Sequence, residues 1–598
     1  MQILRLGLLL FVIFFGAMPV HAADWVARLT QASATPDQGE RVKALMDLYW
    51  DWQLDQYPEL TTWYGEPGDH GRWTDDSLTA IDVRHDFQRA LLAAAKGVER
   101  AGLSADRSLD YALFLDDLEL TVAGFAFPEE LMPLNQMGGV QQDAVSLLAA
   151  MPARTPADFE AILNRLSGLP QVIHQHIALM EKGSKRRITP PRVTLRDVPG
   201  QVEALLPDDP FASALLRPFA TQPADMDAGQ WTELRAQAEK IYREQLAPAY
   251  RELHTFLVDK YIPKARESIA NSALPDGKKW YRHRVRLFTT TDLTPEEIHQ
   301  LGLQEVARIH ARMEEVIRNS GFTGTFAEFT QFLRTDPQFF HTRAEDLIEE
   351  YRDIAKRADA GLPALFGTLP RNTYGVVPVP DYAAKSQTTA YYQPGSLKAG
   401  RAGNYFVNTY DLKMRPRWEM EALTLHESVP GHHLQISLAQ ELPDVHPLRR
   451  NGSYTAFVEG WGLYAESLGE EMGFYQNPYS KFGQLTYEMW RAIRLVVDTG
   501  MHSQGWTREQ AIKYFVENSA KSEHDITVEI DRYIVWPGQA LAYKLGELKL
   551  KELRARARAS LGDRFNVRTF HDRVLEAGAL PLNVLEQRIN AWIESGGT

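Results

Sequence analysis

The chain has 598 residues, no cysteine and a formal net charge of −13 at pH 7. The lack of cysteine excludes a disulfide-stabilised scaffold and a thiolate metal site, so any metal must be held by histidine and carboxylate side chains. The acidic balance and the absence of a long basic run argue against nucleic-acid binding.

The N-terminal residues 1–22 have the pattern of a secretory signal. Arg5 precedes an apolar run at residues 6–18, and Val20 and Ala22 are the small residues of a cleavage site. A membrane anchor is the alternative, but the run is shorter than the ~20 residues that a spanning helix needs. We expect cleavage after Ala22, a mature chain with no membrane span and no lipid-modified cysteine, and a periplasmic or secreted location.

Helical signals dominate the mature chain. Apolar residues at helical spacing predict a helix over residues 41–56. Helix starts are predicted at Thr155, Thr294 and Thr507, because each is followed by proline at the first helical position, by glutamate or glutamine three residues later, or by both. The sequence therefore predicts a mainly α protein.

One region departs from the helical pattern. Residues 375–410 are rich in β-branched and aromatic residues separated by glycine and proline, and they predict a small antiparallel sheet. Its edge could pair with an extended peptide, or the sheet could be purely structural. No linker separates domains, so we expect one large domain with an N-terminal helical part, residues 23–370, and a catalytic part, residues 371–598.

The segment His-Glu-Ser-Val-Pro-Gly-His-His, residues 426–433, directly follows the predicted sheet. Two neighbouring histidines on a helix, with a glutamate after the first, resemble the HExxH zinc motif. In that motif the histidines bind one zinc ion and the glutamate takes a proton from the zinc-bound water. His426 is therefore a predicted ligand and Glu427 the predicted general base.

The second ligand is less simple, because Pro430 stands four residues after His426, where HExxH has histidine. Pro430 cannot donate the helical hydrogen bond and Gly431 permits unusual backbone angles, so the helix must bulge or restart here. His432 could then take the second ligand position. His433 is the competitor, although two straight helical turns from His426, about 10 Å, would separate it from the same ion.

A catalytic zinc needs a third protein ligand and one open position. Glu459 lies in an apolar, helical stretch, residues 456–466, where a carboxylate needs a partner. Glu466 lies two turns further on the same face and is expected to accept a hydrogen bond behind the ligands.

Further segments complete a family pattern: Phe457-Val458-Glu459-Gly460-Trp461, Trp536-Pro537-Gly538-Gln539-Ala540-Leu541-Ala542-Tyr543, Val497-Asp498-Thr499-Gly500-Met501-His502, Gly505-Trp506-Thr507 and Thr289-Thr290-Thr291-Asp292-Leu293-Thr294-Pro295-Glu296-Glu297. With the histidine motif, they resemble the bacterial domain-of-unknown-function family 885 over nearly the whole mature chain. That family is in turn similar to the gluzincin zinc peptidases, which include neurolysin, thimet oligopeptidase and angiotensin-converting enzyme.

The gluzincin resemblance implies a neurolysin-like, two-lobed helical body around a deep cleft. The gluzincin pattern is His-Glu-x-Gly-His with a later glutamate ligand. Aligning its Gly-His with Gly431-His432 leaves two inserted residues here, favours His432 as ligand and assigns Glu459 as the third. His433 would then lie behind the metal or face the substrate.

The resemblance also implies a late tyrosine against the oxyanion. Tyr543 is the first choice and Tyr533 the second, although either could belong to the core. Arg532 could bind a substrate carboxylate through its forked guanidinium, or pair with a neighbouring acid. Asp498 and His502 share a helix face, where they could hydrogen-bond near the site or cap the helix end.

Together these features predict a zinc-dependent hydrolase that cleaves amide bonds of short peptides. A non-catalytic periplasmic protein that contains zinc is one alternative, and a hydrolase of non-peptide amides is another. Dipeptidase, carboxypeptidase and oligopeptidase activities remain equally open, as does the oligomeric state.

Overall fold

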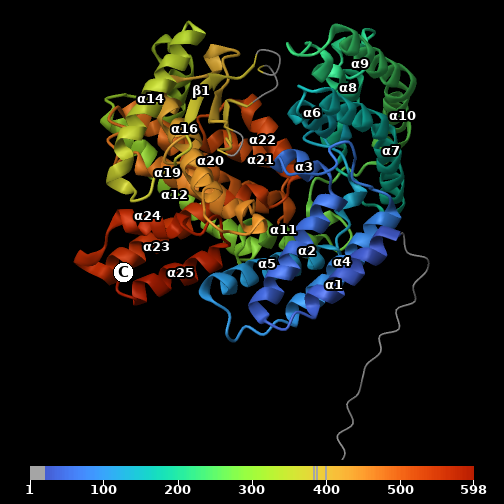
Figure 1. Ribbon diagram of the computed structural model, residues 1–598. Helices are drawn as coiled ribbons and strands as arrows, with labels where there is room; N and C mark the ends of the chain where they lie inside the picture. The colour runs from blue at the N-terminus through green and yellow to red at the C-terminus, as the bar shows by residue number, and fades with distance from the viewer. Residues whose placement is uncertain (1–19, 381–383, 385–387, 398–399, 598) are drawn as a thin grey trace, which may run out of the picture. The chain divides into compact units, whose positions relative to one another are not determined.

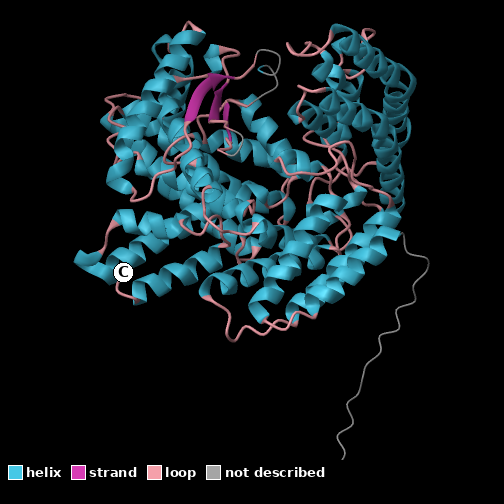
Figure 2. Cartoon of the chain, in the orientation of Figure 1, coloured by secondary structure: helices cyan, strands magenta, loops and turns pink. Residues whose placement is uncertain are grey.

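The computed structural model describes residues 20–380, 384, 388–397 and 400–597, and most of them are helical (Figures 1 and 2). Two compact units make up the chain, Met1–Val122 and Ala123–Thr598. The predicted signal run at residues 6–18 lies outside the described residues. Within the described ranges, no helix combines the length and the apolar character that crossing a membrane requires.

The first unit is built from helices that pack on one another. α1, α2 and α4 are in mutual contact and lie side by side in Figure 1. The apolar stripe predicted for residues 41–56 is buried in α2, which confirms that helix. The helices are α1 (Val20–Ser33), α2 (Gln38–Gln56), α3 (Glu59–Tyr64), α4 (Leu78–Lys96) and α5 (Ala105–Gly124), the last of which runs into the second unit.

The second unit is also mainly helical, with short 3₁₀ and π segments between the longer elements. The predicted helix starts at Thr155, Thr294 and Thr507 are confirmed, and each is a complete capping box. The helices that precede the sheet are α6 (Val140–Ala150), α7 (Pro156–Arg186), α8 (Val198–Glu203), α9 (Ala228–Ile241), α10 (Ala247–Phe256), α11 (Gly277–Thr289), α12 (Pro295–Asn319), α13 (Phe326–Thr335) and α14 (Ala344–Leu365).

The helices that follow the sheet hold the histidine motif. They are α16 (Met420–Glu427), α17 (His432–Gln440), α18 (Pro447–Arg450), α19 (Thr455–Leu468), α20 (Pro478–His502), α21 (Arg508–Asn518), α22 (Glu523–Val535), α23 (Ala542–Leu561), α24 (Val567–Leu575) and α25 (Leu582–Glu594). α14 packs against both α16 and the sheet, so the predicted division at residue 370 falls inside one compact unit.

The sheet has three strands in the order β1-β3-β2: β1 (Tyr374–Pro378), β2 (Ala390–Gln393) and β3 (Gly403–Val407) (Figure 2). β2 and β3 form an antiparallel hairpin, but β1 runs parallel to β3, so the prediction of an antiparallel sheet is wrong for this pair. The chain leaves β1, crosses to the far side of β3 to form β2, and returns as β3. That crossover is what makes β1 and β3 parallel.

α20 is the central helix of the second unit. Apart from Trp490, every residue from Phe482 to His502 is buried, and α12 packs along its length. A helix that is buried all round normally carries apolar side chains only. α20 also carries buried arginine, glutamate, aspartate and histidine side chains, and each of these needs a polar partner.

Candidate metal centre

The histidine motif is split between two helices. α16 ends at Glu427 and α17 begins at His432, so the helix restarts at Pro430-Gly431, as the sequence predicts. Gly431 is required by a close approach, because a Cβ atom there would lie 1.9 Å from the carbonyl oxygen of His426. The restart places His432 against His426, with their ring centroids 4.7 Å apart.

Glu459 completes a three-residue cluster with the two histidines. The Nε2 atoms of His426 and His432 each lie 3.6 Å from the same carboxylate oxygen of Glu459. One donor atom from each residue lies within 4.8 Å of the other two. Zinc bonds of ~2.1 Å at tetrahedral angles separate ligand atoms by about 3.4 Å, so this donor set fits a zinc ion with small adjustments.

α19 holds the cluster through glycine contacts. A Cβ at Gly462 would lie 2.7 Å from the His426 ring, so this imidazole packs directly on the α19 backbone. Gly460 meets Gly546 of α23 in the same way, since a Cβ on Gly460 would lie 2.5 Å from the Gly546 Cα. Trp461 donates its indole N–H to the carbonyl of Pro430 at 2.8 Å, which ties α19 to the break between α16 and α17.

Glu466 lies behind His426. Its fully buried carboxylate contacts His426 Nδ1 at 2.8 Å, which leaves Nε2 facing Glu459. A carboxylate on the far ring nitrogen is the usual way to fix the orientation of a metal-binding histidine. Arg491 of α20 approaches the same Glu466 oxygen at 3.7 Å.

The electrostatics of the cluster favour a cation. Burial alone would lower the pKa of His426, but Glu459 and Glu466 outweigh it and raise the pKa to about 9. Burial would raise the pKa of Glu459, yet its hydrogen bonds to both histidines hold it well below the usual range. The negative charge of Glu459 is therefore retained at neutral pH.

Glu427 borders the cluster without belonging to it. The backbone N–H of Tyr392 in β2 donates to one of its carboxylate oxygens at 3.0 Å. Burial raises the pKa of Glu427, while the positive charges of His426 and His432 oppose that shift. A carboxylate with a raised pKa beside a metal site has the properties of a general base.

His433 faces away from the cluster. Its Nδ1 contacts the hydroxyl of Tyr392 at 2.8 Å and its ring packs on Tyr374 with centroids 4.5 Å apart. Burial lowers the pKa of His433 to about 4, so this imidazole is neutral. The structure therefore brings His432, not His433, to His426 and Glu459.

The late residues predicted from sequence lie in a second group. Tyr543, at the start of α23, accepts a hydrogen bond from Arg532 of α22 at 3.3 Å. Arg532 also contacts both carboxylate oxygens of Glu529 at 3.3 Å. Tyr533 is buried, and its hydroxyl already contacts Trp490, an arginine of α20 and Glu529. Tyr533 therefore lies behind Arg532 and Tyr543.

A family model described as "Bacterial protein of unknown function (DUF885)" matches residues 58–589 of the chain. The chain belongs to this family. No curated protein matches the sequence significantly.

Two solved structures share the fold of this family member. A putative lipoprotein from Colwellia psychrerythraea is 27% identical, with a TM-score of 0.88, and the match covers 94% of this chain and 100% of that one. A putative lipoprotein of unknown function from Shewanella oneidensis is 17% identical, with a TM-score of 0.70 and coverage of 91% and 99%. The second similarity concerns the fold alone.

Sequence reasoning missed Arg491 and Arg494 of α20, which both approach the ring of Tyr543. Their guanidinium carbons lie 5.9 and 4.3 Å from the centre of the Tyr543 ring. The signal was present, because two arginines three residues apart interrupt an otherwise apolar helical stretch. Their partners come from α22 and α23, and the sequence does not reveal that packing.

Asp498 and His502 fasten α20 to the segments around the site. Asp498 accepts hydrogen bonds from the Tyr281 hydroxyl at 2.5 Å and from the Gly538 backbone N–H at 3.1 Å, and burial raises its pKa to about 7. His502 contacts the carbonyl of Tyr533 at 3.0 Å. In the DUF885 member described here, these two residues thus fix the connection from α22 to α23.

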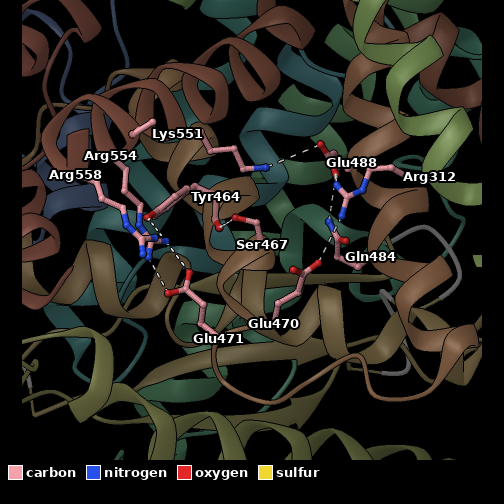
Figure 3. Close-up of a pocket in the computed structure, with 11 residues that line it drawn as sticks. Arg312, Tyr464, Ser467, Glu470, Glu471, Gln484, Glu488, Lys551, Arg554 and Arg558 are labelled. Carbon is pink, nitrogen blue, oxygen red and sulfur yellow. Dashed lines mark hydrogen bonds and ion pairs between the residues drawn. The ribbon is translucent and has the colours of Figure 1, made fainter. Parts of the chain in front are cut away.

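A separate charged cavity of about 360 Å³ lies among α12, α19, α20 and α23 (Figure 3). Its cations are paired: Arg554 binds Glu471 at 2.7 Å, and Arg312 and Lys551 face Glu488. None of the predicted site residues lines it. Its pairing is that of a structural charge network.

Proposed function

We propose that the protein is a zinc-dependent hydrolase that cleaves amide bonds of short peptides. The observation that carries the proposal is the cluster of His426, His432 and Glu459, with donor atoms within 4.8 Å of one another, next to a glutamate outside the donor set. Three protein donors leave one coordination position open, which is the arrangement of catalytic rather than structural zinc sites.

The donor set fits zinc chemically as well as geometrically. Two histidine imidazoles and a carboxylate are typical zinc ligands, and Glu466 supplies the hydrogen bond that orients His426. When bound, zinc lowers the pKa of a coordinated water to about 7 and polarises a carbonyl group.

Side chains of the protein carry out the proton transfers and stabilise the developing negative charge. Glu427 takes the proton of the attacking water and later delivers it to the leaving amine nitrogen. Its bond to the N–H of Tyr392 fixes one carboxylate oxygen and leaves the other for proton transfer. We assign to Tyr543 the stabilisation of the negative charge that develops on the carbonyl oxygen, a role that the gluzincin resemblance implies.

The sheet edge supports an extended substrate. Thr389 pairs with Asn408 through the backbone, so the alternation of antiparallel pairing turns the backbone groups of Ala390 and Tyr392 away from β3. Tyr392 already uses its outward N–H on Glu427. A peptide added along this edge would lie next to the general base.

The same proposal includes a neurolysin-like arrangement of two lobes around a deep cleft, with action in the periplasm or outside the cell. The similarity to a putative lipoprotein is consistent with an exported protein.

Metal analysis and peptide cleavage test the proposal together. Protein purified without added metal should contain about one zinc per chain. Incubation with a peptide library should give fragments by mass spectrometry, and a chelator should abolish them. Folded protein that binds no zinc on titration would overturn the proposal. Bound zinc without cleavage of any peptide would instead favour a non-catalytic zinc protein or a hydrolase of other amides.

A further inference from the structure

Three arginines converge on Tyr543. Arg494 and Arg491 of α20 approach its ring, and Arg532 of α22 donates to its hydroxyl at 3.3 Å. Arg491, Arg494 and Arg532 together with Tyr543 form the arginine cluster. Arg494 is almost fully buried, whereas the side chain of Arg532 retains 16% exposure. The arginine cluster is thus buried at Arg494 and partly accessible to solvent at Arg532.

The arginine cluster has fewer carboxylates than cations. Glu529 is the acid that both Arg494 and Arg532 contact, at 3.1 and 3.3 Å. In the described part of the chain, Nη1 of Arg494 and the Nε atoms of Arg491 and Arg532 are buried without a hydrogen-bond partner. The nitrogen donors of a buried guanidinium group normally have hydrogen-bond partners, because burying a charged donor without a partner costs free energy. These three donors are available to an anionic ligand.

The charged cavity of Figure 3 provides the contrast. There Arg554 has both of its terminal nitrogens on Glu471, at 2.7 Å each. The terminal donors of Arg554 are thus matched within the chain, whereas Arg494 and Arg532 keep donors without a partner. The unmatched donors of Arg494 and Arg532 indicate a ligand that arrives from outside.

The arginine cluster is continuous with the metal centre. Arg491 lies 3.7 Å from Glu466, whose carboxylate holds His426. The arginine cluster therefore lies close enough to the metal centre for one short peptide to contact both.

We propose that Arg494 and Arg532 bind the free C-terminal carboxylate of the peptide, so that the enzyme removes short C-terminal fragments. This inference rests on the proposed hydrolase function. Each of the two arginines has one donor without a partner, so together they can give a planar carboxylate two charge-assisted hydrogen bonds. Every unmodified peptide carries such a carboxylate at its C-terminus. Side-chain carboxylates elsewhere in a peptide would not stand at a fixed distance from the scissile bond.

Matched peptides with a free or an amidated C-terminus provide the test. Amidation should lower kcat/KM about 10- to 100-fold, because a charge-assisted pair is replaced by a neutral group. N-terminal acetylation should have little effect. The released fragments should have one constant length counted from the C-terminus. Equal cleavage of free and amidated peptides would overturn the inference and leave the hydrolase proposal intact.

Arg532→Gln separates recognition from folding. It should lower kcat/KM for the free peptide much more than for the amidated peptide, so the ratio between the two should approach one. A purely structural role would lower both values equally and would overturn the inference. Arg508→Gln is the matched control, since Arg508 has 18% side-chain exposure and an ion pair with Asp531. It should keep the wild-type ratio.

Binding to zinc-loaded Glu427→Gln protein tests the same point without turnover. The free peptide should bind about 10- to 100-fold more tightly than the amide. Equal affinities would overturn the inference. A clear preference for the free peptide in a protein that cleaves nothing would retain the arginine cluster as a carboxylate site and reject only the hydrolase proposal.

Discussion

The two sides of the histidine motif have opposite surroundings. On one side, His426 faces Glu459 and Glu466, and these carboxylates raise its pKa to about 9. On the other side, His433 faces the rings of Tyr374 and Tyr392, and burial lowers its pKa to about 4. Imidazoles seven residues apart therefore have different roles in the structure. The first lies among carboxylates that could hold a cation, whereas the second is a neutral ring that packs and forms hydrogen bonds.

Substitutions of Glu427 and Glu459 should distinguish the general base from the metal ligand most clearly. Glu427→Gln should lower turnover by roughly 10²–10⁴, because the general base is lost. Its zinc content and melting temperature should stay near wild type. Glu459→Gln should weaken zinc binding, because a neutral amide is a poor substitute for a ligating carboxylate. Peptide turnover and elemental analysis of both variants are the measurements. Normal turnover in Glu427→Gln would remove the proposed mechanism, and loss of zinc from it would make Glu427 a ligand.

His432 and His433 test the comparison directly. His432→Ala should lose zinc, since it removes one of the three donors. His433→Ala should retain zinc and lose some activity, because Tyr392 loses its hydrogen-bond partner next to Glu427. Zinc titration of the two purified proteins distinguishes them. Zinc loss from His433→Ala alone would reverse the ligand assignment.

Glu466→Gln should produce a smaller effect on the same side. The amide keeps a hydrogen bond to His426 Nδ1 but removes the charge that supports this ligand. Zinc affinity should fall about 10- to 100-fold, the usual consequence of altering a group that orients a metal ligand. Competition with a fluorescent chelator measures it. Unchanged affinity would show that the Glu466 charge does not support the metal centre.

His571 of α24 is another buried histidine with aromatic neighbours, and it should give the smallest effect. It contacts the Leu365 carbonyl and the Tyr464 hydroxyl, both at 2.8 Å, and burial lowers its pKa to about 4. Above pH 6.5 the imidazole is neutral in the folded and unfolded states. Between pH 6.5 and 4 only the unfolded chain binds the proton, so stability falls as the pH falls, by up to about 3 kcal/mol.

His571→Gln should therefore lose less stability than wild type over this pH window. Urea unfolding of both proteins at pH 7 and pH 5 measures the difference. Other buried histidines contribute equally to both proteins and cancel in the comparison. Identical pH dependence in the two proteins would contradict a neutral His571.

The features that the sequence predicted well are local ones. Capping boxes mark helix starts within four residues, and Pro430-Gly431 marks the helix break because proline lacks an N–H. The orientation of His432 and His433 after the break was harder to predict, because it depends on the backbone angles of Gly431 and on the packing of Trp461 against Pro430. The resemblance favoured His432, and the geometry now brings it to Glu459.

Features that depend on long-range packing could not be predicted. The parallel pairing of β1 requires a crossover whose path the strand pattern does not encode. The arginine cluster draws on three helices, and only the packing of α20 against α22 and α23 brings Arg494 to Tyr543.

The contact between Gly460 and Gly546 has an evolutionary consequence. α19 carries Glu459 beside Gly460, and α23 carries Tyr543 three residues before Gly546, so one backbone-to-backbone contact positions both groups. A side chain on either glycine would push the two helices apart and displace both at once. Substrate preference in this lineage is therefore expected to diversify through residues that line the site, such as Arg532, while the spacing of these two helices stays fixed.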